Sequence, residues 1–433
     1  MNLTEDQILA LAPDEPSKKS GKDLANPNKW VSKGMNEVAL WGEAQGSGSK
    51  PYQTQVDINN IAFKCSCPSR KFPCKHGLGI LFLYARQPNL FTGKEMPTWV
   101  NDWISKRGER EEKKAEKVDK PVDEAAQAKR LENREKKVAD GIEELLLWIK
   151  DIVRNGIINL PEKGYAFWEQ MAKRMVDAQA PGLAGMVRGL GQVSFFKDGW
   201  QTNFINQLLD IHLVINGYKN RNNLSPALQQ DIRTSIGFTQ NQDELKEKVG
   251  VTDTWLVLAK QSSEDENLTV ERYWLHGVKT GQYALILQFL FRGQGGEISF
   301  TPGMYVQAEL VYYPSVSPTR AIIKRQISTT PASPKRRFTD WRAIAENETK
   351  INAEFPFNYP RPYIIKLVTP VLYLNQWWLA DKNNDLMQIN NGFKNIWKLM
   401  AISGGNPVDA AIIGKENLYE PVGVWDNEIY KSL

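Results

Sequence analysis

The sequence predicts an α+β protein with several domains, from its length, a change in hydrophobic period and one highly charged segment. Its 433 residues are too many for a single hydrophobic core and favour two to four domains. Apolar residues recur at helical spacing from Gly141 to about Phe238 and alternate with a period of two from about Thr254. Between Lys106 and Asp140, 22 residues in 35 are charged. This charged stretch separates an N-terminal unit from the rest.

We therefore expect five segments. An N-terminal module covers residues 1–105, and a charged linker or helix covers 106–140. A helical domain follows over 141–245, a β-rich domain over 246–330 and an α+β domain over 331–433. The composition, 41% apolar and 24% charged, is that of an ordinary globular protein and excludes a fully disordered or collagen-like chain.

Local patterns near the N-terminus predict a helix and then a loop. Thr4 and Gln7 have the spacing of a capping box, which predicts a short helix after Thr4. Residues 41–49 begin with Trp-Gly and continue into a run of Gly and Ser. We expect this stretch to be a loop.

A β-hairpin and a helix are expected in the second half of the N-terminal module. Apolar and polar residues alternate from Tyr52 to Phe63 on both sides of the turn signal Asn59-Asn60. The nearly continuous apolar run over residues 78–84, ended by Pro88, predicts a buried helix of about three turns. Together these elements form a ββα unit.

The helical segment contains Gly182, Gly185 and Gly189, spaced three and four residues apart. Small residues at this spacing allow two helices to pack closely. A phosphate-binding loop is the other use of such glycines, but no strand precedes them. We therefore expect a helix contact.

The β-rich and C-terminal segments alternate with a period of two. Strands are expected at residues 255–258, 272–275, 284–291, 305–312 and 321–324, then at 364–368 and 371–379. A helix is expected at residues 341–348.

The three cysteines, Cys65, Cys67 and Cys74, lie within ten residues of one another, and His76 follows the last of them. An odd number of clustered cysteines argues against a disulfide framework. Three thiolates and an imidazole are a complete ligand set for a tetrahedral zinc ion. Because four protein ligands leave no position for water or substrate, we expect one structural Zn²⁺.

The pattern Cys-x-Cys, six residues, Cys-x-His, with a hairpin before it and a helix after it, resembles the SWIM zinc finger over about residues 52–86. Residues 41–52 and 177–183 more loosely resemble longer bacterial proteins that carry this finger near their N-terminus. The resemblance implies zinc binding through Cys65, Cys67, Cys74 and His76, and an α+β fold with an N-terminal ββα SWIM finger, a helical middle and a β-rich C-terminal region. It also implies DNA or protein binding, with a MoxR-type AAA+ ATPase and a von Willebrand A-domain protein as partners.

Three other interpretations of the cluster stay open. An iron–sulfur site of the CDGSH type also uses three cysteines and one histidine, but it needs three residues between the last cysteine and the histidine, whereas only Lys75 stands there. A copper(I) site would not need the histidine. Free buried thiols beside a core histidine are the simplest alternative.

Basic residues lie among the ligands, which raises the question of nucleic acid. Lys64, Arg70, Lys71 and Lys75 would share one small surface around the metal. Such a surface can bind phosphates weakly and without sequence preference. The alternative is that these charges only offset the negative metal site and stabilise its thiolates.

The sequence contains no phosphate-binding loop, metalloprotease motif, nucleophile elbow or dinucleotide fingerprint. The two remaining histidines, His212 and His276, stand next to apolar residues and are expected to pack rather than to catalyse. We therefore expect a non-enzymatic adaptor, with nucleic-acid binding through the finger as the alternative function. The acidic N-terminus and the lack of a long apolar stretch indicate a cytoplasmic protein without membrane contact.

Overall fold

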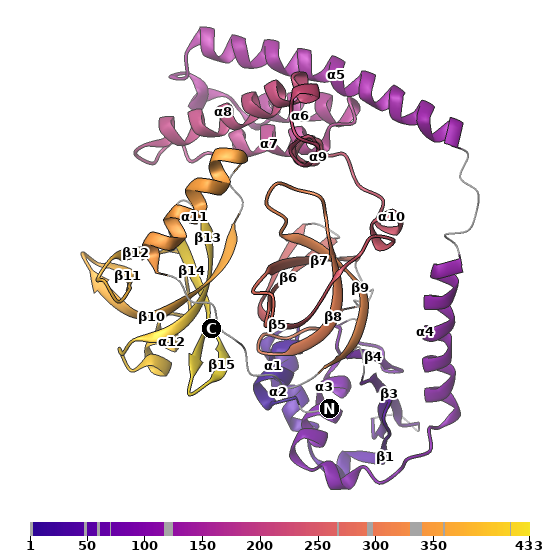
Figure 1. Cartoon of the computed structure of the whole chain (residues 1–433). Coiled ribbons are helices and arrows are strands. Elements are labelled where there is room, and N and C mark those ends of the chain that lie inside the picture. The colour runs from indigo at the N-terminus through magenta and orange to yellow at the C-terminus, as the bar shows by residue number, and fades with distance from the viewer. Residues whose placement is uncertain are drawn as a thin grey trace.

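The computed structural model describes residues 3–46, 50–58, 61–69, 71–116, 124–265, 268–291, 298–329, 340–357, 360–415 and 417–433. An N-terminal module lies below a central β-barrel, a helical bundle lies above the barrel, and a C-terminal sheet lies beside it (Figure 1). The predicted α+β fold class, with a ββα finger, a helical middle and a β-rich C-terminal region, is confirmed.

The N-terminal module is a four-stranded antiparallel sheet covered by helices. Its helices are α1 (Glu5–Leu11), α2 (Glu15–Asp23) and α3 (Lys75–Arg86). Its strands, β1 (Trp30–Met35), β2 (Ala39–Ala44), β3 (Tyr52–Asp57) and β4 (Ala62–Cys65), pair in chain order. The capping box of α1 forms as predicted: Gln7 N donates to Thr4 Oγ1, and Thr4 N donates to Gln7 Oε1. The expected hairpin turn at residues 59–60 lies outside the described residues.

The loop expected at residues 41–49 is wrong in its first half, because residues 41–44 belong to the inner strand β2. Gly42 faces α3 and Trp30, and a Cβ there would stand 2.9 Å from Ile80 Cδ1. The glycine is therefore needed for close packing within the sheet layer, not for a turn.

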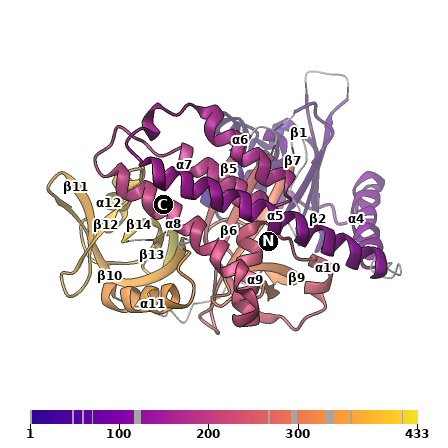
Figure 2. The same ribbon diagram turned by 90° about the horizontal axis from the view of Figure 1, so that it is seen from above.

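The middle of the chain is helical. It contains α4 (Thr98–Glu116), α5 (Glu124–Asn155), α6 (Tyr165–Asp177), α7 (Pro181–Gly191), α8 (Trp200–Lys219), α9 (Pro226–Ile236) and α10 (Gln242–Lys246). In the view from above, α5 to α9 lie over the barrel, and the C-terminal sheet extends to the left of them (Figure 2). Short 3-10 helices occur at Pro27–Lys29, Pro88–Leu90, Leu160–Glu162 and Arg221–Asn223.

The boundary expected at residue 140 falls inside α5, so helical structure in the bundle begins before it. Arg134 donates to Gly237 O at 2.9 Å and lies over the ring of Phe238, while Glu135 accepts hydrogen bonds from Tyr218 and Arg233. The charged stretch therefore contributes its C-terminal part to the bundle. Residues 117–123 of that stretch lie outside the described residues.

One of the three glycines makes the close helix contact. A Cβ on Gly182 would stand 2.1 Å from Ser235 O of α9. Gly185 faces open space, and a Cβ on Gly189 would make only an ordinary contact at 3.5 Å with Gln207. The predicted helix contact therefore belongs to Gly182.

The β-rich segment forms a closed five-stranded barrel. Its strands are β5 (Val251–Asp265), β6 (Leu268–Gly277), β7 (Tyr283–Phe291), β8 (Tyr305–Tyr312) and β9 (Arg320–Thr329), in the order β5-β6-β7-β9-β8. The antiparallel pair β5–β8 and a short parallel pair β7–β9 close the barrel. A small five-stranded barrel of this order has the architecture of an OB-fold.

The C-terminal segment is a six-stranded sheet in the order β12-β11-β10-β13-β14-β15. It contains α11 (Trp341–Glu354), β10 (Arg361–Tyr373), β11 (Gln376–Ala380), β12 (Leu386–Ile389), α12 (Ile396–Ser403), β13 (Val408–Lys415), β14 (Leu418–Asp426) and β15 (Ile429–Ser432). The single strand expected at residues 371–379 is instead a hairpin. Leu374 and Asn375 both have positive φ and turn the chain between β10 and β11.

The N-terminal module and the barrel share one hydrophobic core. Ile8 of α1, Leu78 of α3 and Trp255 of the barrel interior belong to the same buried cluster. The bundle and the C-terminal sheet each have a further cluster of their own. Among the described helices, none has the length and apolar character needed to cross a membrane.

Candidate metal centre

The structure brings the four predicted ligands together at the junction of β4 and α3. Cys65 ends β4, Cys67 follows it, Cys74 is the N-cap of α3 and His76 lies in its first turn. Their ligand atoms all lie within 4.8 Å of one another. His76 Nδ1 is 3.7 Å from Cys65 Sγ and 4.0 Å from Cys74 Sγ. Around a tetrahedral zinc ion, sulfur and nitrogen ligands stand about 3.6 Å apart. The donor set therefore fits zinc in both chemistry and spacing.

Strand pairing positions the first ligand. Cys65 stands opposite Thr54 of β3, whose hydroxyl lies 3.2 Å from Cys65 Sγ. Ser66 extends the pairing beyond the strand, because its N–H donates to Gln53 O and its hydroxyl accepts from Gln53 N, both at 2.9 Å. The β3–β4 hairpin thus holds one sulfur ligand at the edge of the site.

The helix positions the last two ligands. His76 is only 4% exposed, and its ring packs against Tyr52 with a centroid distance of 5.1 Å. In the connecting loop, Phe72 packs edge-on against Phe63 of β4. The Tyr52–His76 contact holds the start of α3 against the hairpin, and the Phe72–Phe63 contact fixes the loop to β4.

The close approach of the three thiols explains why the cluster needs a cation. Contact with Cys74 and burial raise the pKa of Cys65 to about 12. Burial also raises the pKa of Cys67, whereas contact with Cys65 lowers the pKa of Cys74. Three half-buried or buried sulfurs so close together cannot all carry a negative charge unaided. A divalent ion supplies the balancing charge, and thiolates are its ligands.

Family comparisons assign the same two regions. Residues 52–85 match the SWIM zinc finger, and residues 133–236 match the SWIM-associated four-helix bundle domain. The first match contains all four ligands, and the second runs from α5 to the end of α9. No curated protein and no solved structure matches the chain.

The geometry and the match define the class of the site as a structural zinc centre of the SWIM type. The prediction of a zinc-binding site formed by Cys65, Cys67, Cys74 and His76 is confirmed. The chain thus combines a SWIM zinc finger with a SWIM-associated helical bundle.

The basic residues around the centre are placed differently from one another. Lys64 and Lys75 are exposed. The Nζ of Lys71 lies 2.6 Å from Asp14 Oδ2, and this contact, together with hydrogen bonds from Ser17, lowers the pKa of Asp14 to about 2. Arg70 lies outside the described residues. Sequence reasoning missed Asp14 as a partner of Lys71 because no local signal joins positions so far apart in the chain.

Proposed function

We propose that this chain is a non-enzymatic adaptor, stabilised by zinc, that binds protein partners of the MoxR-type AAA+ ATPase and von Willebrand A-domain classes. The observation that carries the proposal is the closed ligand set. With three sulfurs and one imidazole converging, the metal has no position for a substrate and serves to organise the fold. The finger is also built into the core that it shares with the barrel, as expected of a scaffold.

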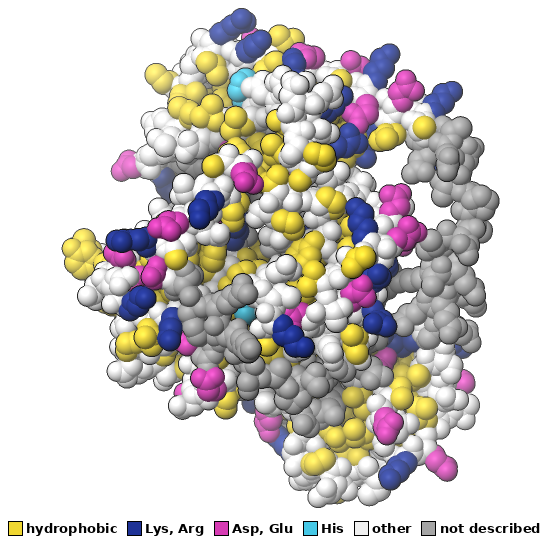
Figure 3. Space-filling model, viewed as in Figure 1, with side chains coloured by type: hydrophobic (Ala, Val, Ile, Leu, Met, Phe, Trp, Pro, Cys, Tyr) yellow, Lys and Arg dark blue, Asp and Glu magenta, His cyan; other side chains and the backbone are white. Residues whose placement is uncertain are grey.

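An exposed apolar surface on the C-terminal sheet is a suitable docking site for such a protein partner. Leu372, Tyr373 and Leu374 form the tip of the β10–β11 hairpin, and Leu374 is 80% exposed. Trp397 of α12 is 73% exposed and contacts the ring of Trp377. In the space-filling view, hydrophobic side chains lie at several separate places on the surface, between charged ones (Figure 3). A cluster of large exposed apolar side chains is typical of a protein interface.

The charges beside this surface indicate the character of the partner. Lys394 and Lys398 are exposed on either side of Trp397 in the chain. A partner surface with an apolar centre and an acidic rim would complement them. We expect the ATPase or the A-domain protein to present such a patch.

A binding assay with purified partners tests the adaptor proposal. The full chain, immobilised, is expected to retain the MoxR-type ATPase or the A-domain protein of the same cell, and the double variant Leu374→Ser/Trp397→Ser to bind at least about tenfold more weakly. The matched control is Ile158→Ser/Phe196→Ser, which removes two other apolar side chains that are 84% and 98% exposed. Failure of the parent chain to retain either partner, or equal loss in both variants, would refute the proposal.

Nucleic-acid binding through the finger is the second candidate function. It is favoured by the exposure of Lys64 and Lys75 beside the metal centre. The pairing of Lys71 with Asp14 weakens it, because that charge is already balanced. The test is a gel-shift titration with Lys64, Arg70, Lys71 and Lys75 changed together to Ala. Unchanged binding and an unchanged salt slope would eliminate the finger as the contact surface.

A further inference from the structure

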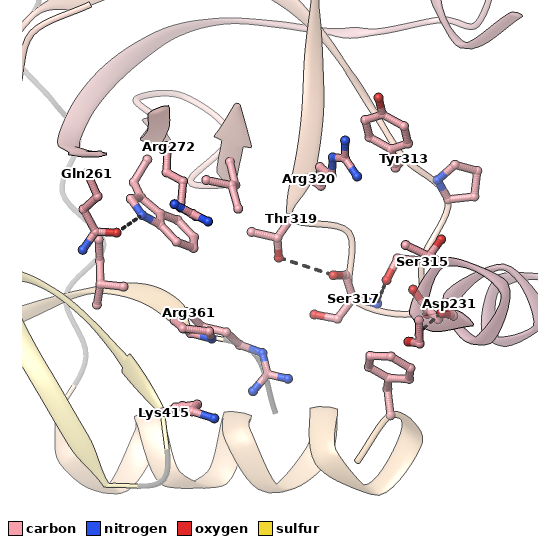
Figure 4. A pocket seen from close by; sticks show the side chains of 18 of the residues that line it. Asp231, Gln261, Arg272, Tyr313, Ser315, Ser317, Thr319, Arg320, Arg361 and Lys415 are labelled. Carbon is pink, nitrogen blue, oxygen red and sulfur yellow. Dashed lines mark hydrogen bonds between the residues drawn. The ribbon is translucent and has the colours of Figure 1, made fainter. Parts of the chain in front are cut away.

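A large hollow lies where the barrel, α9 and the C-terminal sheet meet. Its volume is about 1120 Å³, slightly above the range of roughly 300–1,000 Å³ that is usual for small-molecule pockets. Side chains from all three regions surround the open space (Figure 4). The cavity is therefore formed only when the domains are assembled.

The barrel contributes its outer face to this cavity. Along β6, Tyr273 and Leu275 point into the barrel core, so the alternating residues Arg272 and Trp274 point outward and line the cavity. Phe289 of β7 lies on the same outer face, and the loop of residues 313–319 between β8 and β9 forms one wall. The second and third strands and the loop between the fourth and fifth strands are the elements with which OB-fold barrels bind oligonucleotides and oligosaccharides.

The charge of the lining selects between these ligands. Arg272, Arg320, Arg361 and Lys415 face the cavity, against the acids Asp231 and Glu420. The carboxylate of Asp231 accepts a hydrogen bond from Val316 N at 2.9 Å, so the protein itself already offsets part of its charge. An anionic ligand is favoured over a neutral oligosaccharide.

Two of the arginines have charges that are available to a ligand. Arg272 donates to the hydroxyl of Ser263 at 2.8 Å, and Arg320 lies over the ring of Tyr313 at 4.5 Å. Among the side chains that the structure describes, neither guanidinium is paired with a carboxylate. Arg361 differs, because Glu348 balances its charge.

Aromatic side chains accompany these charges. Phe289 is 48% exposed and lines the cavity. Phe291, two residues further along the same face of β7, is 60% exposed. Along β7, the attachment points of Phe289 and Phe291 are separated by about 7 Å. Exposed rings beside cations are the combination that binds single strands, because bases stack on the rings while the cations contact phosphates.

We infer that the outer face of β6 and β7, together with Arg320 and Lys415, binds a short segment of single-stranded nucleic acid. Phosphates lie against Arg272 and Arg320, and a base stacks on Phe289. This site is separate from the basic residues of the finger, and it goes beyond the proposed adaptor function.

The inference is tested by fluorescence anisotropy with the full-length, zinc-loaded chain and a labelled oligothymidylate of about 12 nucleotides. The parent chain is expected to bind, with an affinity that falls between about 50 mM and about 200 mM salt. Arg272→Gln/Arg320→Gln is expected to weaken binding at least about tenfold and to make the slope of log K against log[salt] shallower by about 1.4, at about 0.7 for each phosphate contact in a single strand. Phe289→Ser is expected to weaken binding about tenfold with the salt slope unchanged.

Two controls distinguish binding at this cavity from a general effect of charge and from binding at the finger. Lys150→Gln/Arg154→Gln removes the same charge from exposed positions on α5 and is expected to leave binding unchanged, as is the alanine variant of the finger. Equal thermal midpoints of the parent and variant chains show that folding is intact. Should the arginine variant lower the midpoint, Lys415→Gln, a change at an exposed position, takes its place.

Several outcomes would overturn the inference. The first is that the parent chain does not bind the oligonucleotide. The second is that the finger variant loses binding while the arginine variant keeps it. The third is that the α5 control loses as much binding as the arginine variant. Displacement of the oligonucleotide by oligoglutamate at the same charge concentration would assign the cavity to acidic peptides instead. Loss of ATPase binding in the variant Leu374→Ser/Trp397→Ser has no bearing on this site, so each of the two proposals can fail without the other.

Discussion

The zinc finger and the helical bundle reach a defined structure by different physical means. In the bundle, side chains such as Leu145, Val187 and Ile211 are fully buried, so apolar packing accounts for its order. In the finger, the loop between the two ligand pairs is mostly exposed, and Pro73 is its one buried residue among those described. The finger therefore depends on its metal as well as on the core that it shares with the barrel, whereas the bundle depends on a core of its own. We therefore expect a chelator to perturb the finger, and substitutions that add bulk to perturb the bundle.

Removal of zinc is the largest expected perturbation. Zinc binding contributes on the order of 10 kcal/mol to the folding of small zinc domains, so a strong chelator should unfold the finger. Hydrogen exchange is expected to lose protection over residues 52–86 and to keep it over residues 140–236. Partial loss is expected where the barrel shares the core with Ile8 and Leu78. Equal loss of protection in the bundle would contradict the comparison.

Gly182→Ala tests the packing of the bundle. Its Cβ would stand 2.1 Å from Ser235 O of α9, a backbone atom that cannot move aside cheaply. The free energy of unfolding should fall by about 1–3 kcal/mol. Zinc content should stay unchanged, since the finger lies in another module.

The matched control for this substitution is Gly185→Ala, at an exposed position of the same helix where a Cβ meets nothing within 4 Å. Because alanine is the better helix former, this variant should be more stable by up to about 1 kcal/mol. Denaturant unfolding measures both. Equal effects of the two substitutions would show that the α7–α9 contact is not tight.

Glu135→Gln tests the polar attachment of α5 with a pH signature. Burial raises the pKa of Glu135, but hydrogen bonds from Tyr218 and Arg233 outweigh burial and bring the pKa below its ordinary value of 4.5. A lowered carboxyl pKa stabilises the folded state above that ordinary value, and the stabilisation is lost as pH falls through the folded-state pKa. The variant should be less stable than the parent by about 1 kcal/mol or less at neutral pH, because the pair is partly solvated. Thermal unfolding from pH 7 down to pH 3 should show the two chains converging, and a difference independent of pH would oppose this account.

Asp14→Asn gives the smallest expected effect. Lys71 and Ser17 hold the pKa of Asp14 at about 2, so the contact is formed at neutral pH and is lost only in strong acid. Because the pair is exposed, the thermal midpoint should scarcely change. The variant frees Lys71, however, and should slightly strengthen any oligonucleotide binding through the finger. A large loss of stability would mean that α2 is essential to the metal centre.

Features encoded by neighbouring residues could be predicted from the sequence. The four metal ligands lie within a dozen residues, the capping box of α1 spans four, and the alternation in β6 and β7 is continuous. Each depends on short-range periodicity or spacing, so it can be recognised in the sequence without knowledge of the fold.

Features that depend on distant contacts could not be predicted. Gly42 resembles a turn residue in the sequence, but it is a packing position created by α3. Residues Arg134 and Glu135 resemble part of a solvated linker until α9 is placed beside them. The cavity lined by Arg272 and Lys415 is formed by the barrel and the C-terminal sheet together, so no single segment of the sequence predicts it.

Metal analysis of the purified chain tests the central claim most directly. The account predicts one zinc per chain in the parent and in the loop control Ser69→Ala, and loss of zinc together with loss of N-terminal protease resistance in Cys74→Ser. A parent chain free of zinc when purified without chelators, or a Cys74→Ser chain that retains its zinc, would contradict the account.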